Sequence, residues 1–113
     1  MSDRTDDERK EIRKEFRDAV NMQPQELEDW LETEESRSVG DSDSGESTGH
    51  RSGRRIVEIK RTSVEDLTEA DHDHMKKVVG YINRHLSQGG PDDDVEHSAW
   101  RYSLMNWGHD PLK

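Results

Sequence analysis

The longest helical pattern in the chain is the feature that most limits its fold. Between Thr68 and Gly89, apolar residues recur at intervals of three and four: Met75, Val78, Val79, Ile82 and Leu86. This spacing places them on one face of an α-helix. It predicts a helix over residues 69–87, with Thr68 as its N-cap. No run of alternating residues elsewhere predicts a strand, so we expect helices to cover this apolar face.

Four shorter patterns predict further helices, over residues 6–20, 24–34, 52–61 and 95–107. Thr5 and Glu8 have the spacing of a capping box at the start of the first of these helices. Pro24 suits the first turn of the second, where its missing N–H costs nothing. Gly108 is a typical residue just beyond the end of the last. The predicted fold class is all-α: a single small domain, residues 1–113, built as a compact bundle of four to five short helices.

A long polar segment, residues 35–51, separates the second predicted helix from the third. It has almost no apolar content and is dense in Ser, Asp and Gly, a composition typical of a flexible loop. Loops of this length in a small domain are usually functional or disordered. Both interpretations stay open: a binding loop and a disordered connector.

The composition bounds the class of protein. Hydrophobic residues make up 27% of the 113 residues and charged residues 39%, so the chain can bury one modest core. The net charge of −10 has two interpretations: an acidic surface for one partner, or adaptation to high salt. We favour the halophilic interpretation. The N-terminus shows no signal-peptide pattern and no stretch is long enough to span a membrane, so we expect an acidic cytoplasmic protein without a membrane partner.

One clearly basic stretch stands out in this acidic chain. Residues 51–61 carry a local net charge of +4, whereas residues 1–50 carry −9. A second basic set lies off the apolar face of the 69–87 helix. Two such helices packed side by side would share one basic patch, although no recognition-helix motif is present. The predicted nucleic-acid-binding residues are Arg51, Ser52, Gly53, Arg54, Arg55, Lys60, Arg61, Lys76 and Lys77.

The position of three arginines strengthens this prediction. Arg51, Arg54 and Arg55 are expected at the N-terminus of a helix, where the dipole is already positive and cations are unfavourable without an anion. Ser52 and Gly53 would add exposed backbone N–H groups, and together these groups form an anion site that suits a phosphate. The alternative is internal: the arginines pair with carboxylates of the first or second helix.

Catalytic and metal-binding motifs are missing from the sequence. The chain has no Cys, which excludes disulfides, thiolate metal sites and Cys nucleophiles. His72 and His74 are two residues apart, and no His pair has the i,i+4 spacing of a helical zinc site. There is no nucleophile elbow and no phosphate-binding P-loop. We therefore expect no metal, no cofactor and no enzymatic activity.

Several segments together resemble the family known as domain of unknown function 3140. These segments are residues 20–22, Pro24, residues 27–31, 38–40, 46–56, 75–81 and 100–111. The resemblance covers about residues 16–113 and implies little chemistry. Some members of that family carry a DNA-binding label. The chain departs from the family pattern at the acidic residues 41–44.

These observations support one leading hypothesis and one alternative. The leading hypothesis is a small DNA-associated protein that contacts phosphates of double-stranded DNA through its basic loop-to-helix segment. The alternative is a non-enzymatic protein–protein interaction module that uses the long loop and the basic helix. Because phosphate contacts weaken steeply with salt, DNA binding in concentrated salt would also need shape or direct contacts.

Overall fold

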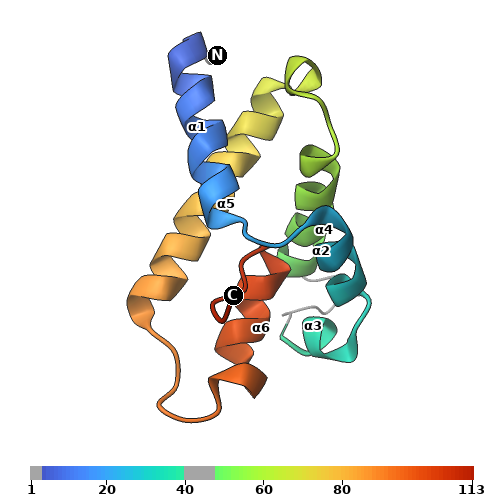
Figure 1. The fold of residues 1–113 in the computed structure, drawn as a ribbon, viewed down its shortest axis with the longest axis vertical. Helices are drawn as coiled ribbons and strands as arrows, with labels where there is room; N and C mark the ends of the chain where they lie inside the picture. Colours follow the sequence, from blue (N-terminus) through green and yellow to red (C-terminus); the bar gives the residue numbers. More distant parts are fainter. Residues whose placement is uncertain (1–3, 40–47) are drawn as a thin grey trace.

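The chain is all-helical in its computed structural model, which describes residues 4–39 and 48–113 (Figure 1). The α-helices are α1 (Asp6–Ala19), α2 (Pro24–Leu31), α3 (Glu34–Ser38), α4 (Thr48–Lys60), α5 (Glu69–Gln88) and α6 (Ala99–Asn106). Two short 3-10 helices, η1 (Val64–Asp66) and η2 (Val95–His97), precede α5 and α6. No strand occurs in the part of the chain that the structure describes. The expected all-α class is confirmed.

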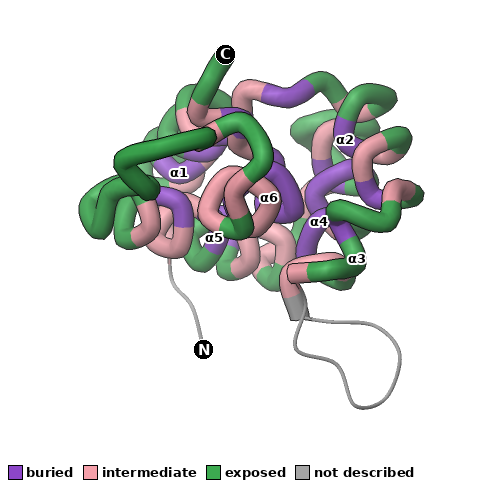
Figure 2. The backbone as a smooth tube through the Cα atoms, turned by 90° about the horizontal axis from the view of Figure 1, so that it is seen from below, coloured by how far each residue is buried: buried purple, intermediate pink, exposed green. Residues whose placement is uncertain are grey.

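Two helix pairs and one central helix make up the architecture. The helix α1 packs along α5, and α2 packs along α4, so segments far apart in sequence lie side by side (Figure 1). Between the two pairs, α6 contacts α2, α3, α4 and α5. Buried residues gather where α6 passes between the pairs (Figure 2). The C-terminal helix therefore joins the two halves of the core.

Each major helix contributes at least one large apolar side chain to a single core. Leu27, Ile56, Val78 and Leu104, from α2, α4, α5 and α6, have no exposed surface, and Phe16 of α1 is 4% exposed. Trp100 packs against this core from the side, and Trp107 lies within it. Most of the apolar positions predicted from helical spacing thus meet in the centre. Leu86 does not: it lies at the end of α5 and is 39% exposed.

The helix ends follow the local signals in the sequence. Thr5 with Glu8, and Thr68 with Asp71, both form complete capping boxes, which satisfy backbone N–H groups at the starts of α1 and α5. Pro24 occupies the first turn of α2. Gly108 has φ +86°, the left-handed conformation that favours glycine just beyond the end of a helix.

The predicted loop over residues 35–51 is wrong at both ends. The helix α3 begins after Thr33, whose side chain caps it, and its residue Ser36 is fully buried. The helix α4 begins at Thr48, four residues before the predicted start. Ser36 is hydrogen-bonded to Asn106, Gly49 lies against Trp107, and His50 is hydrogen-bonded to the Leu31 carbonyl. Such tertiary contacts can override local propensity, and a local pattern does not reveal them. Residues 40–47 of the predicted loop lie outside the described residues.

The polar partner of α3 is Asn106 at the end of α6. Its Oδ1 accepts hydrogen bonds from Trp30 Nε1–H (2.8 Å) and from the Ser36 hydroxyl, and its Nδ2 donates to the Ser36 carbonyl (3.0 Å). Asn106 is only 2% exposed. One buried amide therefore holds α2, α3 and α6 together.

The residues after α6 attach the C-terminus to the α1–α2 connection. Asp110 receives two hydrogen bonds from the Arg101 guanidinium, at 3.1 and 3.0 Å. The side chain of Asn21 donates to the Asp110 carbonyl and accepts from its N–H. His109 Nδ1–H donates to the Ala19 carbonyl at 2.7 Å. Most of the segment 100–111, one of those that resemble the family, is therefore used to hold the fold together.

Candidate nucleic-acid interface

The helix α4 presents two chemically different faces. At about 100° per residue, Arg51, Arg54 and Arg55 fall on one side, and Ser52 and Gly53 fall on the other. Arg51 and Arg54 are exposed and Arg55 is half-buried, whereas Ser52 and Gly53 are buried. We call the three arginines the arginine face.

Small residues on the inner face of α4 are required by close packing against α6. A Cβ at Gly53 would lie 2.6 Å from the Asn106 carbonyl oxygen and 2.7 Å from a methyl of Leu31. A Cβ at Gly49 would lie 3.2 Å from Trp107 Nε1. The spacing of small residues in this segment is thus explained by packing, while the arginines between them face outward.

The arginine face borders a polar surface pocket between α4 and α5. The pocket has a volume of about 460 Å³ and is lined by the three arginines together with Glu58 and Asp71. Arg55 Nη2 lies 3.1 Å from Asp71 Oδ1 in an ion pair. The N–H of Thr68 and the Arg55 guanidinium lower the pKa of Asp71. One of the three guanidinium groups is therefore already paired with an acid of this chain.

A half-buried histidine lies beside this surface. His74 of α5 forms a 3.0 Å hydrogen bond with the Ser52 hydroxyl, and its ring stacks on Trp107 with centroids 6.4 Å apart. Burial, together with the positive charges of Arg55 and Lys77, lowers the pKa of His74. A neutral His74 adds no positive charge to the surface around the arginine face. Lys77 is the cation of α5 whose charge acts on His74 together with that of Arg55.

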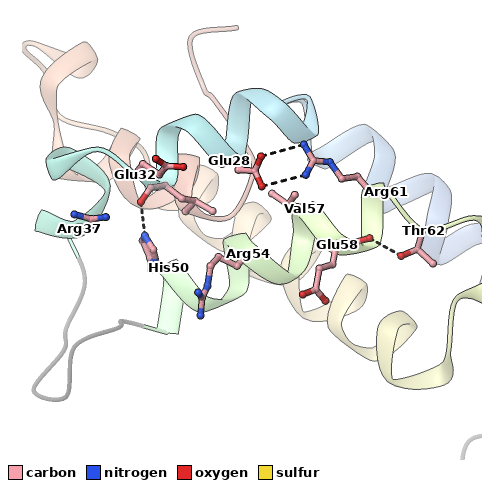
Figure 3. A pocket seen from close by; sticks show the side chains of 10 residues that line it. Glu28, Glu32, Arg37, His50, Arg54, Val57, Glu58, Arg61 and Thr62 are labelled. Atoms are coloured by element: carbon pink, nitrogen blue, oxygen red, sulfur yellow. Dashed lines mark hydrogen bonds and ion pairs between the residues drawn. The ribbon is translucent and has the colours of Figure 1, made fainter.

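The C-terminal end of α4 carries Arg61, which faces α2. Its guanidinium nitrogens lie 3.3 and 3.4 Å from the carboxylate oxygens of Glu28 (Figure 3). Arg61, which is not one of the three arginines in the internal-pairing alternative, thus pairs with a carboxylate of the second predicted helix. A groove of about 690 Å³ runs between α2 and α4, with Leu31 and Val57 among its lining residues and His50 at one end. The side chain of Arg54 points away from α2 (Figure 3).

The remaining predicted cations lie elsewhere. Lys60 is half-buried and donates to the Val20 carbonyl at 3.4 Å. It lies nine residues after Arg51, about two and a half turns, and so on the opposite side of α4. Lys76 is exposed on α5. Hydrogen bonds with Thr5 are the main cause of the lowered pKa of Glu8 on α1, and the charge of Lys76 adds a smaller effect. The charges of Arg55 of the arginine face and Lys77 act on the same histidine, His74, whereas Lys60 lies on the opposite side of α4. Arg61 lines the groove between α2 and α4 together with Arg54, and there it is paired with Glu28.

Two parts of the predicted anion site are corrected by these positions. Ser52 and Gly53 do not expose backbone N–H groups, because both are inside α4 and packed against its neighbours. Arg54 and Arg55 are in the second turn of α4, since this helix begins at Thr48. The dipole effect falls off within the first turn, so it gives no reason for an anion beside them. What remains is the charge and exposure of the arginines.

The part of the chain that the structure describes has neither a membrane-spanning helix nor a metal-binding cluster. Over residues 4–39 and 48–113, no helix is long and apolar enough to cross a membrane. The same residues contain no group of three or more His, Cys, Asp or Glu side chains placed to hold a metal ion.

The fold and the site define a small all-helical protein with an arginine-rich face on one helix. The family model for proteins of unknown function DUF3140 matches residues 15–105, and the chain belongs to this family. The resemblance in the sequence is thereby confirmed. No curated protein and no solved structure was found to be similar to the chain.

Proposed function

We propose that this protein associates with double-stranded DNA in a non-enzymatic role and that the arginine face contacts backbone phosphates. The observation that carries the proposal is the outward direction of three arginines on one helix face in a chain of net charge −10. Arg is the side chain best suited to phosphate, because its planar fork donates two parallel hydrogen bonds.

The spacing of the arginines fits a phosphate backbone. Arg51 and Arg55 are four residues apart, about 6 Å along the helix axis. Two successive nucleotides of one DNA strand rise by about 3.4 Å each. The arginine face can therefore reach neighbouring phosphates of one strand, with Lys77 adding charge from α5.

Acidic neighbours set the expected character of this binding. Glu58 and Asp71 line the same pocket as the arginines, so Arg55 must exchange its carboxylate partner for a phosphate. Binding through a few phosphate contacts falls steeply with salt and does not depend on base sequence. We expect weak, salt-dependent binding to duplex DNA with little sequence preference.

The test is a salt series of binding to a fluorescent DNA duplex. The variant Arg51→Gln/Arg54→Gln removes two charges from the arginine face. The matched control, Lys10→Gln/Lys14→Gln, removes two charges from exposed positions of α1. We expect the slope of log affinity against log salt to be shallower by about 1.8 in the arginine variant. The control variant keeps the wild-type slope. Equal losses in the two variants, or no binding by the wild type at low salt, would refute the proposal.

A second candidate function, protein–protein interaction, is favoured by the groove between α2 and α4. Its rim carries both signs of charge, including Glu28, Glu32 and Arg37, and Leu31 and Val57 add apolar surface (Figure 3). Carboxylates repel phosphates, whereas mixed charge around an apolar floor suits a polypeptide. This groove therefore fits a protein segment better than DNA.

The two candidates separate in one experiment. Cross-linking is carried out in nuclease-treated cell extract with a photoreactive residue in place of Glu32, and again with one in place of Lys14. A protein that cross-links through position 32 and not through position 14 supports the interaction module. If no protein cross-links specifically through position 32, the interaction module is refuted and DNA association is left as the candidate function.

A further inference from the structure

A third concave site lies on the inner side of α4, away from the arginine face. This pocket has a volume of about 210 Å³ and lies between α1, α4, η1 and α5, where Phe16, Ile59 and Met75 supply buried apolar surface. We call it the lysine pocket. The cations that line it are Arg13, Arg17 and Lys60.

The charge around the lysine pocket is unlike that of the rest of the chain. Acidic residues number 27 against 17 basic ones in the sequence, yet none of the residues that line this pocket is acidic. Within residues 4–39 and 48–113, none of the three cations forms an ion pair with a carboxylate. The acids of this protein lie elsewhere, and the cations around the pocket are left to interact with something else.

Lys60 is the most constrained of the three cations. Its ammonium group is half-buried and has one weak partner, the Val20 carbonyl at 3.4 Å. Burial and the positive charges of Arg17 and Lys113 lower the pKa of Lys60. Lys113 itself is paired with Glu26. An anion beside Lys60 would relieve this repulsion, because a nearby opposite charge favours the charged form of a side chain.

Arg13 is held in place by a buried histidine. Arg13 Nη1–H donates to His72 Nε2 at 3.1 Å, and His72 Nδ1–H donates to the Thr68 carbonyl at 2.8 Å. His72 is 2% exposed. This arrangement uses one guanidinium nitrogen and leaves others to face a ligand. The cationic rim is therefore partly preorganised, which lowers the cost of ordering it on binding.

We infer that the lysine pocket binds a small amphiphilic carboxylate, with its anionic group against Lys60 and Arg17 and its apolar chain over Phe16, Ile59 and Met75. The pocket volume corresponds to about seven times the liquid volume of one water, so it admits a chain of roughly six to eight carbons. The apolar floor excludes a purely ionic ligand, and the cationic rim excludes a purely apolar one.

This site is independent of the proposed DNA contact. Lys60 lies on the opposite side of α4 from Arg51, and Arg13 and Arg17 belong to α1. Arg13 and Arg17 have no place among the sequence-predicted site residues. The i,i+4 spacing of these two arginines around Phe16 is the only local signal for them, and their approach to Lys60 is tertiary.

The experiment is a titration of the isotope-labelled full chain with octanoate, followed by NMR spectra of its methyl and amide groups. Two matched probes separate the two parts of the ligand: acetate carries the anion alone, and 1-octanol carries the chain alone. We expect octanoate to shift the methyl signals of Ile59, Leu67 and Met75, with at least tenfold weaker responses to either control probe. The proposal would be overturned if 1-octanol or acetate bound as tightly as octanoate. It would also be overturned if the signals that shift belonged only to residues outside the pocket.

Variants then assign the anion contact. Lys60→Gln and Arg17→Gln each remove one cation and keep a polar side chain, and Arg17 is exposed, so its replacement leaves folding intact. We expect each to weaken octanoate binding at least fivefold. Lys14→Gln, which removes a charge from an exposed position of the same helix, is the control and leaves the affinity unchanged. An equal loss in Lys14→Gln, or no loss in Arg17→Gln and Lys60→Gln, would show that the rim does not recognise the carboxylate.

Discussion

The C-terminal segment, residues 100–111, and the arginine face of α4 use polar side chains in opposite ways. In the first, Arg101, Asn106 and Asp110 point inward and find partners within the chain. In the second, Arg51 and Arg54 point outward from a helix whose other side is packed against α6. Both regions belong to segments that resemble the family, so resemblance alone does not separate structural residues from binding residues.

This difference between inward-pointing and outward-pointing polar side chains indicates which residues are candidates for binding. A buried polar group must keep its partners, since leaving it unsatisfied costs the full desolvation penalty. An ion pair of an exposed charge contributes little to folding, so exchanging its partner for a ligand costs little. The comparison therefore predicts a gradient of stability effects, from the C-terminal segment to the arginine face.

The largest effect is expected at Asn106. Asn106→Ala leaves the partly buried Trp30 indole N–H and the buried Ser36 carbonyl without their present partner. We expect the free energy of unfolding to fall by about 4 kcal/mol, because each unsatisfied buried group costs about 1–3 kcal/mol. Urea unfolding followed by Trp fluorescence measures it. Asn83→Ala at an exposed position of α5 is the control, with a change below about 0.5 kcal/mol. Similar losses of stability in Asn106→Ala and Asn83→Ala would contradict the structural role assigned to the C-terminal segment.

A smaller effect with a distinctive pH dependence is expected at Asp110. Burial acts to raise the pKa of this carboxyl, but hydrogen bonds from Arg101 and from the Leu112 N–H lower it overall. Because the folded pKa lies below the unfolded one, the carboxylate stabilises the fold above the unfolded value, about 3.9. This contribution is lost as the pH falls through the folded pKa.

Asp110→Asn tests this assignment. We expect it to cost about 2 kcal/mol near pH 7, since it breaks a charged pair whose side chains are 12% and 19% exposed. The difference from wild type should shrink as the pH falls below about 4, where the wild-type carboxyl also takes up a proton. Unfolding curves at pH 7, 4 and 3 measure it, with Asp92→Asn at an exposed position as the control. A constant difference at all three values would contradict the assignment.

Glycine substitutions sharpen the comparison inside the helices. Gly53→Ala places a Cβ 2.6 Å from the Asn106 carbonyl oxygen, whereas a Cβ at Gly80 of α5 meets nothing within 4 Å. Overpacking costs about 1–3 kcal/mol, and alanine regains up to about 1 kcal/mol in a helix. We expect Gly53→Ala to destabilise by about 1 kcal/mol and Gly80→Ala to stabilise by about 0.5 kcal/mol. Thermal unfolding of both variants measures these changes in stability. A gain in stability for Gly53→Ala would mean that α4 and α6 are not tightly packed at this position.

Local signals predicted most of the fold, and tertiary contacts account for what they missed. Helical spacing and capping residues such as Thr5 and Thr68 act within one helix, so they are visible in sequence. The helix α3 and the first turn of α4 depend on contacts with Asn106 and Trp107, which are over fifty residues away. Their polar composition therefore indicated a loop.

The candidate site shows the same division. Charge patterning identified the arginines of α4, and the exposure of Arg51 and Arg54 is observed. It could not tell that Lys60, five residues after Arg55, would be turned inward beside Arg17, because the faces of α4 are set by what packs on them. Charge counts locate a basic segment, and only the packing divides its cations between two sides of α4.

The smallest effect on stability is expected at the arginine face, which has no structural role in this comparison. Arg51→Gln/Arg54→Gln replaces two exposed charges on the outer face of α4 with side chains that favour helix about as well. Exposed ion pairs are worth about 0–1 kcal/mol each, so whatever contacts these arginines make within the chain add little to its stability. We expect the free energy of unfolding to change by less than about 0.5 kcal/mol, measured by urea unfolding at 0.15 M salt. A loss near that of Asn106→Ala would show that the arginine face is part of the fold. It would also remove the reason for assigning a ligand to that face, because the contacts of these arginines within the chain would then stabilise the fold.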